Sequence, residues 1–165
     1  MATFTDLPDI VLSPLKTRPD TDWYKAPAGH WCSAQIVEHL ALGIEWCAAG
    51  FEDRRARDPM VRRPLKLLER IARILVMDLG FFPPFMQAPD RSVPPEKVER
   101  GAAEMHFRAA LEHTDKVVKL LLPTRSRDLF VKHPRLGDLT LEEWLEFHVR
   151  HARHHAKQIR QRLSA

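Results

Sequence analysis

The distribution of proline constrains the fold of this 165-residue chain more than any other feature. All 13 prolines lie outside four windows, which span residues 28–58, 65–82, 96–122 and 135–165. Proline lacks a backbone donor and clashes with the preceding helical turn, so it is tolerated least in helix interiors. The four proline-free windows therefore predict four main helices.

Apolar residues recur at helical spacing inside the first three windows. In the first window, Ser33 is a candidate N-cap and Gly50 is a candidate helix end. The second window carries an apolar stripe, which consists of Leu67, Leu68, Ile71, Ile74 and Leu75. The third follows the helix-starting composition around Pro94 and Pro95, and it stops before Pro123. These patterns predict three long amphipathic helices.

The fourth window has the clearest helix start. Thr140 followed by Glu143 forms a capping box, in which each residue's side chain bonds to the other's backbone. Leu139, just before the cap, can pack against Trp144 as a hydrophobic staple. The last helix is therefore expected to begin at Leu141.

Signals for β-strands are weak, because no segment alternates apolar and polar residues convincingly. We expect an all-α protein with the architecture of an up-and-down four-helix bundle, in a single domain over residues 1–165. The bundle is expected to occupy residues 28–165. Residues 1–27 are expected to form an N-terminal extension of loop or short elements, and residues 54–63 a similar connection.

Composition and the N-terminus bear on where the protein works. Hydrophobic residues make up 44% and charged residues 29%, which is typical of globular proteins and too apolar for disorder. No apolar run is long enough to predict a membrane span. Asp6, Pro8 and Asp9 interrupt the apolar core that a signal peptide needs, which predicts a cytoplasmic protein. In a reducing compartment, Cys32 and Cys47 are expected to be free thiols.

The net charge of +4 permits weak attraction to polyanions but does not require it. The basic residues of segment 54–63 are accompanied by no groove-reading or base-stacking motif. We interpret this segment as a solvated surface and expect neither a nucleic acid nor a membrane as partner.

The chain contains nine histidines, and their positions give the clearest indication of its function. The stripe of the last helix that must face the core contains three of them; it consists of Leu141, Trp144, Leu145, His148, His151, Ala152, His155 and Ile159. Burying an imidazole without partners costs free energy. A metal ion would compensate, because neutral imidazole is the commonest ligand for transition metals.

Helical geometry favours one pair among these histidines. His151 and His155 lie about 40° apart around the helix and about 6 Å apart along it, as in helices that present two zinc ligands. His148 is about 10.5 Å along the axis from His155, too far to share one ion with it. His148 with His151 remains an alternative pair. His154 is expected to point to the helix flank and to be solvated.

A third ligand has to come from another helix, and the first helix offers His39. A single histidine on an apolar face is usually a hydrogen-bonded core residue, but opposite a histidine pair it becomes a ligand candidate. His106 and His113 could line a pocket, although we interpret them as partly exposed or hydrogen-bonded structural residues. Trp31, Trp46 and Trp144 are interpreted mainly as packing residues.

Several of these residues together resemble the DinB-like superfamily. They are Trp31, Gln35, His39, Leu40, His133, Pro134, Gly137, Leu139, Trp144 and the run over residues 151–159. The chain looks most similar to a branch described as a domain of unknown function, which carries His-Pro-x-x-Gly and His-x-x-His-His-x-x-Gln motifs. The resemblance spans about residues 28–162. Leu136 departs from it, since an aromatic residue is expected there.

The resemblance implies a four-helix bundle whose metal is held by one histidine on an early helix and two on the last. In this sequence those are His39, His151 and His155. Zinc or nickel is expected, with iron or copper as alternatives, because a set of three imidazole ligands does not discriminate among these four metals. Residues expected to support the ligands or to line the pocket are Gln35, His148, Gln158, Trp31 and His133.

Two classes of function follow from such a site. The first is a metal-dependent enzyme, a transferase or hydrolase, since three protein ligands leave a position for substrate. The resemblance implies thiol-dependent chemistry, with a small-molecule substrate, a low-molecular-weight thiol as partner, and a homodimer. The alternative is a non-catalytic, stress-associated binding protein in which the metal is structural or regulatory.

Overall fold

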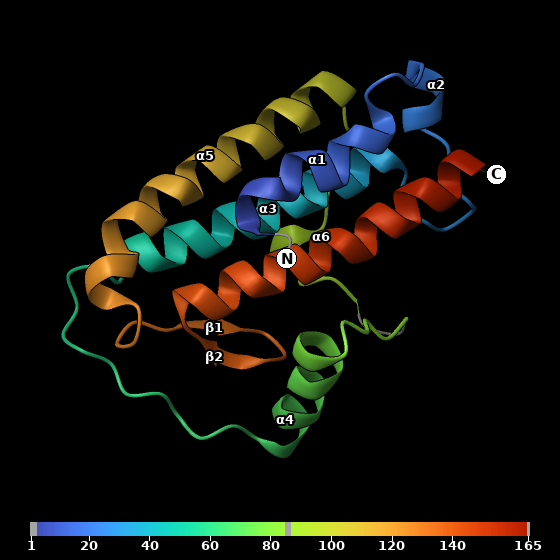
Figure 1. Cartoon of the computed structure of the whole chain (residues 1–165). Helices are drawn as coiled ribbons and strands as arrows, with labels where there is room; N and C mark the ends of the chain where they lie inside the picture. The colour runs from blue at the N-terminus through green and yellow to red at the C-terminus, as the bar shows by residue number, and fades with distance from the viewer. Residues whose placement is uncertain (1–2, 85–86, 165) are drawn as a thin grey trace.

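The computed structural model describes residues 3–84 and 87–164, and they are mostly helical, as the sequence predicts (Figure 1). The helices are α1 (Leu7–Leu12), α2 (Asp20–Trp23), α3 (Ser33–Glu52), α4 (Leu67–Arg73), α5 (Arg100–Arg125) and α6 (Leu141–Ser164). Short 3-10 turns cover Phe4–Asp6, Ser13–Leu15 and Asp90–Ser92, and a π-helical segment, Ile74–Asp78, continues α4. The two strands are β1 (Val131–His133) and β2 (Gly137–Leu139). None of the helices in the described ranges combines the length and apolar character needed to cross a bilayer.

The three long helices pack with α1 around the main core, and α3 and α5 run in the same direction (Figure 1). Along α5, His106 contacts Glu38 of α3, and His113 contacts Glu52 further along both helices. These are the first and third of the predicted helices, which also run parallel in an up-and-down order, but the second predicted helix contributes no residue to the main core, so the predicted bundle is not confirmed. The long connection over residues 53–99 returns the chain to the same end of the molecule, which allows two successive long helices to be parallel.

The N-terminal segment contributes to the core. Leu7, Val11 and Leu15 are completely buried, in the same cluster as Ile36 of α3 and Ile159 of α6. Helix α1 lies along α6 (Figure 1). The short elements expected here are present, and they supply the apolar cover that α6 needs on this side.

The helix predicted within the window over residues 65–82 is present, since α4 and the π-helical segment that continues it run from Leu67 to Asp78. Helix α4 ends at Arg73, and the chain leaves the π-helical segment at Gly80, whose φ is +64°. The predicted stripe does not face the core, since Leu67 and Leu68 are 72% and 77% exposed. Periodicity locates an apolar face of a helix, but it does not say which way that face turns.

Helix ends follow local chemistry that the sequence only partly indicates. Cys32 rather than Ser33 is the N-cap of α3, and this helix continues past Gly50. Helix α5 begins only at Arg100, after Glu99 caps it by accepting from the amide of Ala102 at 2.7 Å, and it passes through Pro123 in its last turn.

The predicted start of α6 is confirmed. The capping box is formed, because the Glu143 amide donates to the Thr140 hydroxyl at 3.2 Å and the Thr140 amide donates to the Glu143 carboxylate at 2.8 Å. The cap fixes where the helix begins, and it therefore sets which residues of α6 face inward.

A small hairpin precedes α6, and the sequence does not predict it. Strands β1 and β2 are antiparallel, with Val131 opposite Leu139 and His133 opposite Gly137. Gly137 has a φ of +77°, a conformation that favours glycine. Strands of three residues are too short for an alternating pattern to be recognised. The hairpin places His133 beside the first turns of α6, where its ring lies 5.1 Å from that of Trp144.

Candidate metal centre

Three imidazoles from two helices meet at one point inside the molecule. His39 comes from the second turn of α3, and His151 and His155 come from successive turns of α6. The Nε2 atom of His151 lies 3.2 Å from Nε2 of His39 and 3.0 Å from Nε2 of His155. The candidate ligand atoms all lie within 4.8 Å of one another. The structure thus brings together the three residues that the sequence singles out.

Two of these rings have their protonation fixed by an oxygen acceptor. Nδ1 of His39 lies 2.6 Å from the carbonyl oxygen of Ser92, and Nδ1 of His155 lies 2.8 Å from Oε1 of Gln158. A carbonyl oxygen only accepts hydrogen bonds, so each Nδ1 must carry the proton and donate it. In the neutral rings, Nε2 of His39 and of His155 therefore presents a lone pair to the centre of the cluster.

The third ring cannot satisfy both of those lone pairs. Neutral His151 has one N–H, and its Nε2 faces two acceptors, so it can donate to one of them at most. At least one nitrogen lone pair is then left facing another nitrogen at hydrogen-bond distance. A cation at the centre would remove this repulsion, which makes the arrangement suitable for a metal ion.

Burial keeps the three imidazoles neutral. His39 and His155 are only 4% and 7% exposed. Burial lowers the pKa of His39 and, with the neighbouring imidazoles, holds the pKa values of His151 and His155 well below their ordinary range. Neutral imidazole is the form that binds a metal, so the rings are ready to act as ligands at neutral pH.

Aromatic side chains surround the cluster. The ring of Trp31 lies 4.9 Å from that of His39, and the ring of Phe147 stacks on His151 at 5.1 Å. Phe82 also stacks on His151, at 5.5 Å, and its ring lies 4.8 Å from that of His154 and 6.2 Å from that of Phe147. Trp31 lies at the site as expected. Phe82 is missed by the sequence analysis, because it belongs to a connection that only the tertiary fold brings to α6.

Two further histidines lie close to the cluster without joining it. His148 is 2% exposed, and its Nε2 has no hydrogen-bond partner among the described residues. His133 accepts from the amides of Arg135 and Leu136, each at 3.1 Å, through Nδ1. Burial is the largest cause that lowers the pKa of each of these two histidines, to about 3. The three-histidine group contains His151 but not His148, the other member of the alternative pair.

The two glutamines predicted to support the ligands behave differently. Gln158 accepts from His155, and its amide nitrogen lies 3.1 Å from Nε2 of His154. Gln35 bonds instead to the backbone of Cys32, Pro95 and Glu96, at 3.1–3.2 Å. It therefore fixes the start of α3 to the loop before α5, and among the described residues it makes no hydrogen bond to the three imidazoles.

His154 also departs from expectation. It is half-buried against Phe82 and Gln158, where a solvated position was expected. Burial lowers its pKa. The reason for the difference is the segment around Phe82, which covers this flank of α6.

The remaining candidates have structural roles, as the sequence analysis expects. His106 lies 3.0 Å from Glu38 and 3.3 Å from Glu45, and therefore links α5 to α3. Cys32 and Cys47 are both free thiols, which confirms the prediction. Burial raises the pKa of the Cys47 thiol, so this residue is inert packing.

Comparison with known proteins gives one match. No curated protein and no solved structure matches the chain. The model of a family described as "Protein of unknown function (DUF1569)" matches residues 4–162, which include the three-histidine cluster and every residue that supports it. The match covers nearly the whole chain, and the chain therefore belongs to this family of unknown function.

Proposed function

We propose that this chain is a metal-binding protein of the DinB-like superfamily, with a divalent transition metal held by His39, His151 and His155. The observation that carries the proposal is the convergence of three imidazole Nε2 atoms, two of which lack a proton because their rings donate through Nδ1. Such second contacts orient metal-binding histidines and fix their tautomer. The residues present fit a metal ion in donor type, in number and in protonation.

In this proposal the four helices of a DinB-like bundle are α1, α3, α5 and α6. Helix α3 provides the early ligand and α6 the two late ones, which is the distribution that the resemblance implies. Helix α4 then lies outside the bundle. The parallel direction of α3 and α5 requires the long connection over residues 53–99, and this connection carries Ser92 to His39.

Three imidazole ligands suit zinc or nickel, and iron and copper remain alternatives. A structural zinc site normally has four protein ligands, whereas three leave a position for another molecule. When bound, the ion would supply Lewis acidity and would lower the pKa of a coordinated thiol. We therefore propose a metal-dependent transferase that uses a low-molecular-weight thiol and a small-molecule substrate.

The chain's own residues would then control access and orientation. His151 is the most exposed ligand, so an incoming molecule would approach beside its ring, next to the adjoining rings of Phe82 and Phe147. These apolar rings would exclude water from the reacting groups. Because Nδ1 of His133 accepts from two amides, its Nε2 carries the proton and could donate it to a bound molecule next to Phe147.

One observation favours the alternative of a structural or regulatory metal. His39 and His155 are almost completely buried, and rings of Trp31, Phe82 and Phe147 cover the cluster. A site enclosed in this way would stabilise the contact between α3 and α6 without turning over a substrate. The protein would then be a stress-associated binding protein.

Cobalt substitution tests the proposal and separates the two candidates. Cobalt should enter the site and give visible absorption bands, and a small thiol should add a sulfur-to-cobalt band in the near ultraviolet. Failure of the wild-type protein to take up cobalt, zinc or nickel would contradict the metal site itself. Cobalt bands that do not change with millimolar thiol, together with a lower melting temperature after chelation, would favour the structural metal.

A further inference from the structure

Helix α4 is oriented the opposite way from an ordinary surface helix. Such a helix turns its apolar stripe to the core and its charges to water. In α4 the buried side is polar, since Glu69 is 9% exposed, whereas Leu67, Leu68 and Ile71 are 72%, 77% and 46% exposed. The apolar face of α4 therefore has no partner within the described chain.

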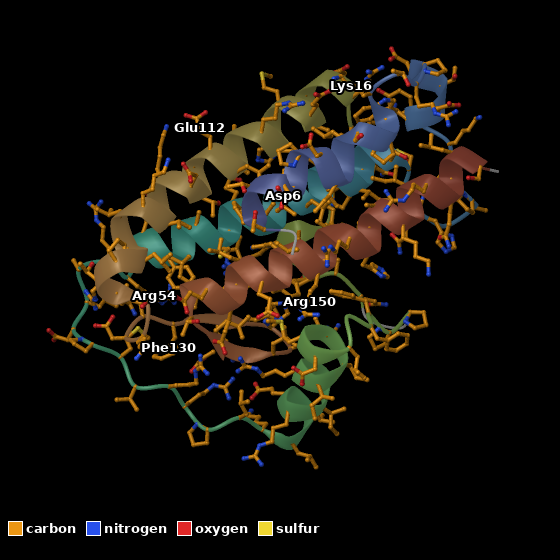
Figure 2. All side chains as sticks on the ribbon, in the orientation of Figure 1. Asp6, Lys16, Arg54, Glu112, Phe130 and Arg150 are labelled. Carbon is orange, nitrogen blue, oxygen red and sulfur yellow. The ribbon has the colours of Figure 1, made fainter. Side chains whose placement is uncertain are left out.

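Ion pairs hold α4 in this orientation. Arg63 binds Glu69 at 2.6 Å and approaches Asp138 of β2 at 3.6 Å. Arg73, from the last turn of α4, pairs with Glu143 at the start of α6. Arg62 pairs with the same carboxylate, and its guanidinium lies 5.0 Å from the ring of Phe130. Phe130 is labelled in Figure 2. Specific contacts to β2 and α6 thus fix the polar side inward.

The exposed apolar residues are concentrated around this helix. Seven of the eleven large hydrophobic residues that are exposed in the described chain lie within residues 61–81, and they are Val61, Leu67, Leu68, Ile71, Ile74, Leu79 and Phe81. Exposed apolar residues gathered in this way mark interaction surfaces in globular proteins. The surface ends next to the three histidines, because Phe82 stacks on His151. We call the surface formed by these seven residues the α4 patch.

Basic side chains surround the α4 patch. Residues 54–73 contain eight Lys and Arg against two Asp and Glu, a net charge of +6. The whole chain carries +4, so the remainder carries −2. Three of the eight, Arg62, Arg63 and Arg73, are taken up in the ion pairs, while Lys66 and Arg70 are exposed on α4 itself. The α4 patch is therefore complementary to a partner that is both apolar and negatively charged.

We propose that the α4 patch binds an anionic lipid surface, with α4 lying in the plane of the interface. An apolar helical face with basic flanks is the pattern of interfacial helices, whose apolar side enters the headgroup region. Helix α4 projects from the rest of the molecule, so it can reach a flat surface (Figure 1). A second copy is a poorer partner, because pairing two patches would bring two segments of charge +6 together.

Vesicle binding by the full chain tests this proposal. Wild-type protein should sediment with vesicles of phosphatidylglycerol and phosphatidylcholine, but not with phosphatidylcholine alone, and added salt should release it. The double variant Leu68→Glu/Ile71→Glu should lower the vesicle affinity by at least about tenfold. Its matched control is Met105→Glu/Leu120→Glu, which changes two residues of α5 that are 69% and 56% exposed. This control should bind like the wild type.

Near-ultraviolet circular dichroism checks that both variants fold. A second double variant, Lys66→Gln/Arg70→Gln, keeps the apolar residues and should also weaken binding to anionic vesicles. It provides an independent test if Leu68→Glu/Ile71→Glu does not fold. No sedimentation of wild-type protein with anionic vesicles would overturn the proposal. So would equal binding by the α4 and α5 variants, or a solution dimer that the α4 variant disperses and that does not bind vesicles.

Discussion

At the scale of single residues, two oxygen acceptors determine what the histidine cluster can do. The Ser92 carbonyl and the Gln158 amide each take the Nδ1 proton of one imidazole. Without them, His39 and His155 could adopt the other tautomer and point an N–H at the centre, which would exclude a cation. The sequence indicates Gln158 through its spacing from His155, but Ser92 is more than fifty residues from His39 and has no signal in the sequence.

Gln158→Leu tests this role of an acceptor. The substitution removes the partner of His155 Nδ1, and loss of such a contact typically lowers metal affinity by about 10–100-fold. Zinc affinity, measured by competition with a chromogenic chelator, should fall accordingly. Gln35→Leu is the matched control, because among the described residues Gln35 hydrogen-bonds only to backbone groups, of Cys32, Pro95 and Glu96. An equal loss of affinity in both variants would contradict the assignment.

At the scale of elements, the hairpin before α6 shows how one backbone conformation positions a site residue. The turn from β1 to β2 depends on Gly137, whose φ of +77° is unfavourable for other residues. The Nε1 of Trp144 donates to the carbonyl of Val131 at 3.0 Å, which ties the hairpin to α6. His133 is fixed beside the site through this connection.

Gly137→Ala should therefore destabilise the protein. The new methyl would lie 2.6 Å from Leu65, and the strained backbone alone costs about 1–3 kcal/mol. Gly43→Ala should do the opposite, because among the described residues the new methyl would meet no atom within 4 Å beyond its chain neighbours and the nearby backbone of its own helix. Alanine stabilises a helix interior by about 0.5–1 kcal/mol relative to glycine. Urea denaturation at neutral pH measures both. Unchanged stability of Gly137→Ala would show that the turn does not require glycine.

The sequence predicts the features that depend on residues close together in the chain, and it misses those that depend on residues far apart. The start of α6 and the spacing of His151 and His155 depend on residues within a few positions, and the structure agrees with the sequence there. The outward turn of the α4 stripe depends on partners far along the chain. Glu143, for example, lies 70 residues beyond Arg73. Local patterns cannot contain that information.

At the scale of the whole molecule, buried neutral histidines link folding to pH. Burial lowers the pKa of His133 and of His148 to about 3, whereas an unfolded chain has the ordinary value of about 6.5. Below pH 6.5 the unfolded chain takes up protons that the folded protein does not. The free energy of unfolding of the metal-free protein therefore falls as pH decreases from 6.5 towards 3.

Each of these histidines should contribute a slope of up to about 1.4 kcal/mol per pH unit. His148→Phe, which removes one titrating group, should flatten the dependence by about that amount between pH 6 and pH 5. Urea denaturation in the presence of a chelator at these pH values measures the slopes. If the variant and the wild type lose stability in parallel, His148 does not couple folding to pH.

The central claim is that three histidines from two helices form one metal site, and metal content tests it most directly. Wild-type protein loaded with zinc or nickel and freed of excess metal should retain about one ion per chain by elemental mass spectrometry. His39→Ala, His151→Ala and His155→Ala should each lose most of it, whereas His154→Ala, a neighbour outside the group, should keep it. Full occupancy in any of the first three variants, or equal loss in His154→Ala, would contradict the account.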